Sequence, residues 1–335
     1  MTNRERVIAS LHHEQPDITP YCIGFTYHAH AKMVEYYGDP DFEAKVGNCI
    51  TGISANAALP WREVAPDIWE DPFGAHWNRG IDRDIGNVCN RRVTPENLAE
   101  YEFPSLENPP SCANADEVIR ANPDQFIMAD IGFSLFERAW VLTGMEQLLM
   151  AMVDEPAFAH ALFDRIVEYN LRAIERACAH NIDAMYFGDD WGQQTGVLMG
   201  PELWREFIKP RIAQMYAAVK KHGKYVVIHS CGKVDELFPE LIDLGLDVFN
   251  PFQPEVIDVY AAKRNFGDRL TFFGGISTQR TLPYGTADET RTEVRRLIAE
   301  VGKNGGYIAA PAHAIPADAK AENIAAMIEV LQNQG

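Results

Sequence analysis

Residues 224–232 read KYVVIHSCG, an apolar run that ends directly in a histidine and a cysteine. Short runs of the same kind, apolar and then polar, recur through the last two thirds of the chain at residues 126–129, 184–187, 247–249, 270–273 and 307–309. They have the length and the apolar character of strands that are buried on both faces. The repetition predicts a parallel sheet that is covered by helices.

Helical patterns separate these runs. The apolar positions of one helix share a period near 3.6 and comprise Phe158, Leu162, Ile166, Tyr169, Ala173 and Ala177. Thr286 with Glu289 fits a capping box at the start of another helix. Pro210 predicts a kink or break in the helix that begins near Pro201. The chain therefore alternates strand and helix.

The number of strands decides between two architectures. A strand at residues 19–25 and another within residues 50–80 bring the total to eight, and eight parallel strands close a barrel. A doubly wound sheet is the alternative, but no Gly-x-Gly-x-x-Gly follows a first strand. We predict an α/β protein with a (β/α)8 TIM barrel as a single domain over residues 1–335. An irregular or hairpin insertion is expected at about 61–104, either as a lid or as a structural embellishment.

The composition narrows the classes of partner. The 335 residues include 30 Lys and Arg against 48 Asp and Glu, a net charge of −18 that disfavours nucleic acid and anionic lipid. No apolar run approaches the roughly 18 residues of a membrane span, and the first twenty residues lack the apolar core of a secretory signal. The six cysteines show no repeated spacing, which indicates reduced thiols. We expect a cytoplasmic protein.

Polar side chains follow nearly every predicted strand, and in a barrel the chemistry lies at the carboxyl ends of the strands. Any one of these residues, taken alone, is equally explained as a loop residue that caps the next helix. Because they converge from most of the strands, we predict a substrate-binding set made of Tyr27, His28, Asp130, Tyr186, Asn250 and Gln253.

His229 and Cys231 form the sharpest pair in the sequence. In extended backbone the side chains of residues i and i+2 point the same way, so imidazole and thiolate can reach one metal ion. A catalytic zinc needs about three protein ligands and an open position. The best third ligand is His313, which follows the last apolar run. The alternative is a metal-free arrangement in which His229 binds a substrate or carbonyl group and Cys231 packs in the core.

Asp189 and Asp190 place two carboxylates at the end of one strand. Two acids so close together raise the pKa of one of them, which suits a general acid or the recognition of a cationic or hydroxylated group. We predict Asp190 and Asp189 as catalytic residues. The alternative is that one acid caps a helix or binds a backbone amide while the other is only solvated.

The quoted segment is one of several motifs that resemble a known family. The chain opens with Arg4-Glu5-Arg6-Val7 and His13-Glu14-Gln15-Pro16-Asp17, and the stronger motifs are GDDWGQQTG at 188–196, KYVVIHSCG at 224–232, NPFQP at 250–254, FGGI at 273–276 and AAPAHAIPADAKAENIAAM at 309–327. Over nearly its whole length the chain resembles the uroporphyrinogen decarboxylase-like superfamily, which includes corrinoid-dependent methyltransferases and the haem-pathway decarboxylase. The resemblance implies a (β/α)8 barrel, in agreement with the strand count.

Two features favour the methyltransferase branch. The decarboxylases carry an Arg-rich segment near the N-terminus for a substrate with eight carboxylates, and the matching residues 25–30 contain no arginine. His229-x-Cys231 is similar to the zinc-binding His-x-Cys of the family's methyltransferases that act with coenzyme M. Those proteins have a cysteine as third ligand where this chain has His313, whereas the decarboxylases use a histidine there as a substrate contact. Three interpretations stay open: His313 completes the metal site, it binds substrate, or an acid is the third ligand.

The resemblance implies a zinc-dependent methyltransferase. Zn²⁺ would be the cofactor, and a corrinoid would be carried by a separate partner protein, because the chain has no Asp-x-His-x-x-Gly segment for binding cobalamin. The small-molecule methyl donor or acceptor is an aromatic methyl ether, as in O-demethylation, an amine or a thiol. One alternative is a metal-independent decarboxylase of a tetrapyrrole that uses Asp130, Asp189 or Asp190. Another is a non-catalytic barrel that binds a small molecule or corrinoid. Barrels of this size often form homodimers, and the sequence shows no interface.

Overall fold

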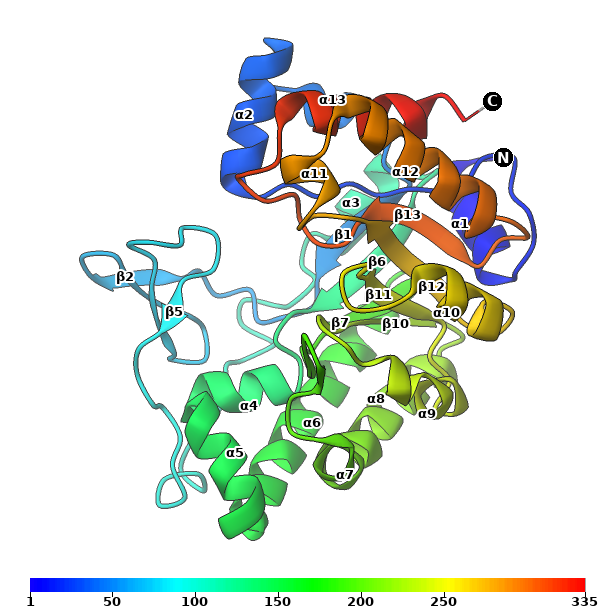
Figure 1. Ribbon diagram of the computed structural model, residues 1–335. Helices are drawn as coiled ribbons and strands as arrows, with labels where there is room; N and C mark the ends of the chain where they lie inside the picture. Colours follow the sequence, from blue (N-terminus) through cyan, green and yellow to red (C-terminus); the bar gives the residue numbers. More distant parts are fainter. Residues whose placement is uncertain (335) are drawn as a thin grey trace.

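The central sheet of the protein contains seven parallel strands. The computed structural model describes residues 1–334, and its strands pair in the order β1-β6-β7-β10-β11-β12-β13 (Figure 1). Their bounds are β1 Ile50–Ser54, β6 Phe126–Ile131, β7 Ala184–Gly188, β10 Tyr225–His229, β11 Val248–Phe252, β12 Thr271–Ile276 and β13 Tyr307–Pro311. The six strands predicted after residue 125 are confirmed. All six extend by one to three residues beyond the predicted end, because polar residues such as His229 and Asn250 continue the ladder.

An irregular eighth segment closes the barrel. Tyr21 and Phe25 form isolated parallel bridges with Ala309 and Ile315, beyond the edge strand β13. On the other side the Cys49 amide donates to the Tyr21 carbonyl at 2.9 Å, next to the start of β1. The strand predicted at residues 19–25 is therefore present as bridges, and the predicted (β/α)8 barrel is confirmed.

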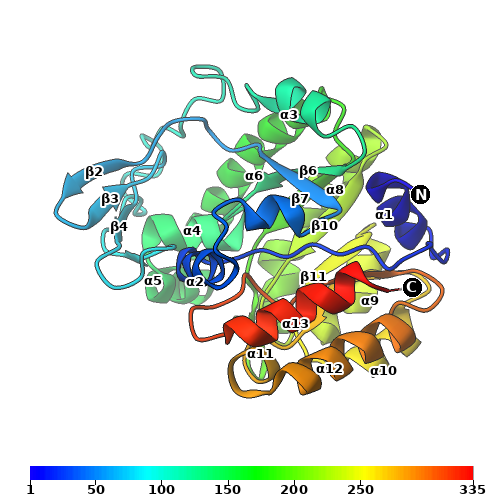
Figure 2. The same ribbon diagram turned by 90° about the horizontal axis from the view of Figure 1, so that it is seen from above.

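Helices cover the outside of the barrel (Figure 2). The helical segments are α1 Asn3–Leu11, α2 Tyr27–Tyr37, α3 Ala115–Ala121, α4 Phe136–Thr143, α5 Met145–Asp154, α6 Pro156–Cys178, α7 Pro201–Leu203, α8 Lys209–Lys221, α9 Phe238–Asp243, α10 Val259–Phe266, α11 Thr281–Tyr284, α12 Ala287–Glu300 and α13 Ala321–Gln332. The predicted capping box at Thr286 and Glu289 is confirmed at the start of α12. A π-helical turn, Trp204–Ile208, precedes Pro210 at the predicted break. Within residues 1–334, no helix combines the length and apolar character that crossing a membrane requires.

Alternation along each strand divides the core into two parts. In β10, Val226 and Ile228 pack outward against the covering helices, whereas Val227 points into the barrel. Inward side chains of the neighbouring strands fill the lower barrel, and Val7 and Leu11 of α1 close its floor. His229 continues the inward series one step above Val227, so the same period brings it to the open upper end.

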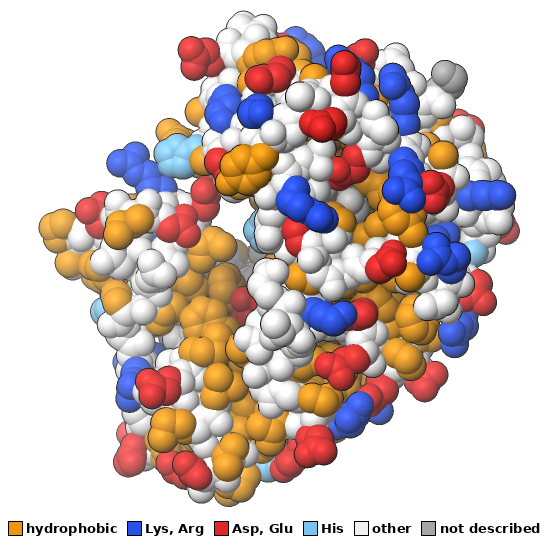
Figure 3. Space-filling model, in the orientation of Figure 1, with side chains coloured by type: hydrophobic (Ala, Val, Ile, Leu, Met, Phe, Trp, Pro, Cys, Tyr) orange, Lys and Arg blue, Asp and Glu red, His pale blue; other side chains and the backbone are white. Residues whose placement is uncertain are grey.

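A small antiparallel sheet occupies the N-terminal third between β1 and α3. Its strands pair in the order β2-β3-β4-β5, with bounds Arg62–Ala65, Ile68–Glu70, His76–Asn78 and Asn87–Val88. It projects from the barrel in both ribbon views (Figures 1 and 2). The sheet lies inside the range 61–104 for which we expected an irregular or hairpin segment. The space-filling view shows a hollow between this sheet and the upper part of the barrel (Figure 3).

Candidate metal centre

Four inward side chains form a polar layer at the carboxyl ends of adjacent strands. Asp130 and Tyr186 are register partners on β6 and β7, and His229 and Asn250 are partners on β10 and β11. Each lies two or four residues after an inward core side chain of its own strand. The structure thus brings together four of the residues that the sequence predicted for the site.

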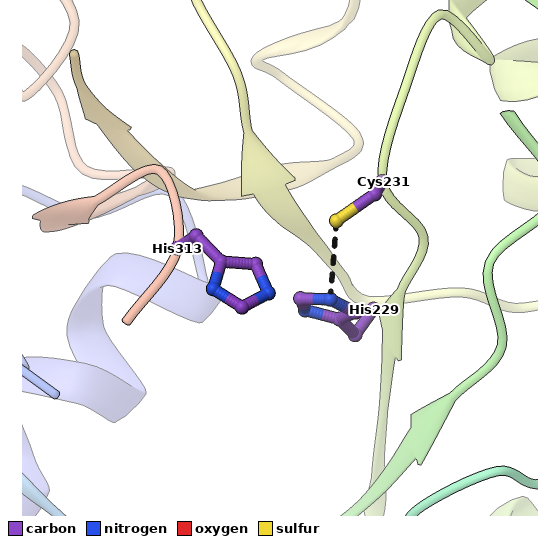
Figure 4. Close-up of side chains that lie close together, drawn as sticks. All are labelled: His229, Cys231 and His313. Atoms are coloured by element: carbon purple, nitrogen blue, oxygen red, sulfur yellow. Dashed lines mark hydrogen bonds between the residues drawn. The ribbon is translucent and has the colours of Figure 1, made fainter. Parts of the chain in front are cut away.

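His229, Cys231 and His313 converge above this layer (Figure 4). One ligand atom from each residue lies within 4.8 Å of the other two. The Cys231 Sγ is 3.5 Å from His229 Nε2, and the His229 and His313 ring centroids are 5.6 Å apart. His229 ends β10, whereas His313 comes from the loop after β13. Two loops that are distant in sequence therefore supply one compact donor set.

The donor set fits zinc. One thiol and two imidazoles are ligands that zinc accepts, and three protein ligands leave a coordination position open. Burial raises the pKa of the Cys231 thiol, and the nearby acids Asp190 and Glu137 raise it further, so a dication is the charge that would favour the thiolate here. Burial and the neighbouring His229 lower the pKa of His313, which favours the neutral ring that a metal requires.

Asp190 lies beside the three donors. Its Oδ1 accepts a hydrogen bond from the Cys231 backbone amide at 2.7 Å and lies 3.7 Å from His229 Nε2. The side chain is 38% exposed, so it faces the open mouth of the barrel. This position allows Asp190 to orient the Cys231 loop and to exchange a proton with a molecule bound there.

Asp189 is placed quite differently from its neighbour. It is fully buried, and its carboxylate accepts hydrogen bonds from the Leu135 and Glu137 amides at 3.1 and 2.9 Å and from the Trp191 indole at 2.5 Å. Desolvation raises its pKa to about 6. These contacts fix the first turn of α4, and the catalytic role predicted for Asp189 stays a prediction.

Close backbone packing between Gly192 and Gly232 fixes the loop that carries Cys231. Gly232 has φ +87°, and a Cβ there would lie 2.4 Å from the Gly192 carbonyl carbon. The Gly232 amide donates to Gln253 Oε1 at 3.2 Å, and the Gln253 side chain is buried. The loops after β7 and β10 can pack this closely only with glycine at both positions. Gln253 therefore holds the Cys231 loop, and its predicted role in binding substrate stays a prediction.

Comparison with known proteins assigns a family to this arrangement. The family model described as uroporphyrinogen decarboxylase (URO-D) matches residues 90–334, which is most of the chain. The chain belongs to the URO-D family. The stronger motifs, including KYVVIHSCG, lie within the matched residues, whereas the opening motifs at 4–7 and 13–17 precede them.

Two curated relatives of this URO-D family protein point to different reactions. The chain is 30% identical over 132 residues to a methylcobamide:CoM methyltransferase, MtaA, of Methanosarcina barkeri, covering 39% of this chain and 36% of that protein. It is 26% identical over 191 residues to a uroporphyrinogen decarboxylase of Pelodictyon phaeoclathratiforme, covering 55% and 51%. The matches thus span about a third to a half of these relatives.

A solved structure supports the fold along the whole chain. A methyltransferase from Methanosarcina mazei superposes with a TM-score of 0.74 at 18% identity, covering 100% of this chain and 99% of that one. At this identity the similarity establishes the shared architecture. It agrees with the closed barrel described above.

Tyr27 and His28 of the URO-D family protein lie apart from the converging donors. Both are exposed in the first turn of α2, and the Tyr27 amide donates to Asp84 Oδ1 at 2.9 Å. Tyr27 borders an open pocket of about 430 Å³ with Trp69 and Arg79 of the small sheet. Their predicted role in binding substrate stays a prediction, now for the outer rim of the hollow.

Two residues near the site escaped the sequence analysis. Ser54 ends β1 as the register partner of Asp130, whose pKa burial raises to about 6. Glu137 lies in the first turn of α4, and burial with the charges of Asp190 and Asp189 raises its pKa. Glu137 could have been found from its position, because it is an acid in the first turn of a helix that follows a barrel strand. From the sequence alone, however, such an acid is interpreted as a residue that stabilises the helix dipole.

Proposed function

We propose that this protein is a zinc-dependent methyltransferase that moves a methyl group between a small methylated substrate and a corrinoid on a separate protein. The observation that carries the proposal is the convergence of His229, Cys231 and His313, with ligand atoms within 4.8 Å at the carboxyl end of the barrel. Such a set of three leaves room for a substrate atom. The MtaA relative, named as a methylcobamide:CoM methyltransferase, supports the same reaction class.

Each residue has a distinct part in this proposal. Bound at these three side chains, Zn²⁺ would act as a Lewis acid toward an ether oxygen, amine or thiol of the methyl donor or acceptor. Asp190 borders the open position and is the candidate to give or take the substrate proton. Tyr186 and Asp130 form the buried wall below. Asp189 holds α4 in place and does not touch the substrate.

A metal-independent decarboxylase is the second candidate. The uroporphyrinogen decarboxylases among the relatives favour it. Burial raises the pKa of Tyr186, and the charges of Asp130, Asp190 and Glu137 add to that rise, so several acids surround one point in the barrel. A mouth that is rich in acids repels a substrate with eight carboxylates. The electrostatics therefore favour methyl transfer.

Metal analysis tests the proposed site directly. We expect about one zinc per chain in protein purified without chelator, and its loss in Cys231→Ala and in His313→Ala, as measured by elemental mass spectrometry. Cys89→Ala is the matched control, because Cys89 is exposed in the small sheet and should leave the zinc content unchanged. A wild-type protein that stays metal-free after zinc reconstitution contradicts the proposal.

The reaction is tested with methylcobalamin and coenzyme M. We expect zinc-loaded wild type to demethylate methylcobalamin, followed by its absorbance spectrum, and Cys231→Ala to lose that activity. If zinc binds but the methyl group stays on cobalt with thiol, amine and phenol acceptors, the protein is a binding barrel. Release of carbon dioxide from a uroporphyrinogen without metal would instead establish the decarboxylase.

A further inference from the structure

The Asn250 side chain is held by protein partners inside the barrel. It is 8% exposed, and its amide makes three hydrogen bonds to three different residues. Nδ2 donates to the Phe273 carbonyl at 3.0 Å, the Tyr186 hydroxyl donates to Oδ1 at 3.1 Å, and His229 Nδ1 lies 2.6 Å from the same oxygen. Both lone pairs of Oδ1 and one of the two Nδ2 hydrogens therefore have protein partners.

The Phe273 contact fixes which end of the amide faces His229. A backbone carbonyl only accepts hydrogen bonds, so the amide nitrogen must be the group that faces it. The amide oxygen then faces Tyr186 and His229. A flip of the amide would place two acceptors against each other at Phe273. The orientation of Asn250 thus follows from its partners.

The oxygen in turn dictates the position of the proton on His229. Because Oδ1 only accepts, the bond at 2.6 Å requires the hydrogen on Nδ1. In the neutral ring Nε2 then carries the lone pair. That atom lies 3.5 Å from Cys231 Sγ, on the side where the three donors meet. The opposite tautomer would place two lone pairs against each other at Asn250.

We propose that Asn250 is a positioning residue that holds His229 in the Nδ1–H tautomer, with the Nε2 lone pair presented to the cation site. The inference rests on the proposed function in one respect: the metal of that proposal is the group that the Nε2 lone pair would bind. It replaces the predicted substrate-binding role of Asn250. Tyr186 donates to the second lone pair of Oδ1 and so saturates the oxygen.

The sheet register explains why asparagine suits this position. Asn250 and His229 are Cα partners on adjacent parallel strands, and both point inward. The short amide side chain spans the distance between the strands and also reaches Phe273 on β12. A leucine at position 250 has similar size but offers no acceptor, which leaves Nδ1 without a partner.

The tautomer can be measured without any metal. In metal-free wild type labelled with ¹⁵N-histidine at pH 8, we expect NMR correlations to show the hydrogen of His229 on Nδ1. His229→Gln assigns the signal by its disappearance. The tautomer itself is measured in wild type, so the result does not depend on the stability of a variant. A His229 hydrogen on Nε2 overturns the proposal.

Zinc affinity supplies the second readout. We expect Asn250→Leu to weaken Zn²⁺ binding by about 10- to 100-fold in a chelator competition, and Asn250→Asp, which keeps an acceptor oxygen, to restore it to within a few fold. Tyr186→Phe is the control, because it removes the other hydrogen bond to Oδ1 and leaves the His229 contact. We expect its zinc affinity to stay close to that of wild type. Equal zinc affinity in Asn250→Leu and wild type, with the Nδ1–H tautomer retained, contradicts the inference.

Failure of the two proposals can be told apart. If wild type shows the Nδ1–H tautomer but binds no zinc, the positioning by Asn250 stands and the proposed zinc function fails. If wild type binds about one zinc through Cys231 while His229 carries its hydrogen on Nε2, the zinc function stands and the role of Asn250 fails.

Discussion

The barrel from β6 to β13 and the small antiparallel sheet follow different physical rules. All residues of β11, β12 and β13 are buried, whereas all residues of β2 are exposed. The barrel strands are covered by helices on one face and by core side chains on the other. The small sheet projects from the barrel and exposes Ile81 almost completely, at 94%.

The difference shows where a rigid site can be built. His229 lies at the end of a strand held on both sides by parallel neighbours, so a metal ligand there has a fixed position. The small sheet packs on α4 through Trp77 against Val141, and a buried ion pair joins Asp71 to Arg138 of α4 at 3.1 Å. We infer that the barrel carries the chemistry and that the sheet borders the entrance.

Breaking that ion pair should give the largest effect on stability. Asp71→Ala leaves the buried Arg138 guanidinium without its carboxylate and removes the acceptor for the Phe73 and Ala75 amides. We expect the free energy of unfolding in urea to fall by about 3–5 kcal/mol. Arg62→Gln is the control, because its pair with Glu70 in the same sheet is exposed and should change stability by about 1 kcal/mol or less. A similar small loss in both variants would show that the sheet is not anchored through Asp71.

The adjacent acids Asp189 and Asp190 allow a buried and a partly exposed position to be compared within the barrel itself. Asp189→Ala leaves the Leu135 and Glu137 amides and the Trp191 indole without an acceptor, so we expect a loss of about 2–4 kcal/mol in urea unfolding. Asp190→Ala, at a half-exposed position, should cost about 1 kcal/mol or less and should impair methyl transfer instead. A larger loss of stability in Asp190→Ala than in Asp189→Ala would assign the structural role to Asp190 instead.

The pH dependence of stability tests Asp130, the acid below the proposed metal site. Burial raises the pKa of Asp130 to about 6, above its ordinary value near 4 in the unfolded chain. The folded state therefore binds the proton more tightly, and this stabilisation is present below about pH 4 and is lost as the pH rises through about 6. Between pH 4.5 and 7.5, wild type should lose about 2 kcal/mol that Asp130→Asn does not lose, as measured by urea unfolding. Parallel pH profiles of the two proteins would show that Asp130 is solvated.

Much of the barrel could be read from the sequence, because its signals are local. Buried parallel strands give uninterrupted apolar runs, and the capping box at Thr286 and Glu289 lies within one helical turn. The first barrel segment and the four short strands of the small sheet were harder to place. Tyr21 forms only an isolated bridge, and β2 has no buried residue. Burial is what produces a hydrophobic pattern, so segments without it leave little trace.

The candidate site divides in the same way. The sequence placed polar residues at strand ends, and the spacing of His229 and Cys231 with the place of His313 after the last apolar run singled out these three. It gave Asp189 and Asp190 the same role, because neighbours in sequence look alike. Only the structure shows that one carboxylate turns into the scaffold and the other faces the mouth. Glu137 entered the site by the packing of α4, which no local pattern predicts.

The sequence by itself determined the alternation of strands and helices in the barrel, the number of barrel strands and the polar residues at the strand ends, because these depend on periods of two and 3.6 along the chain. The tertiary structure alone decided which of those residues meet. Closing the barrel brings His313 to His229 and lays Asn250 against its ring, and such contacts depend on register and curvature between distant segments. The physical reason is that the donors of a metal site are selected by distance in space, and a linear sequence does not contain that distance.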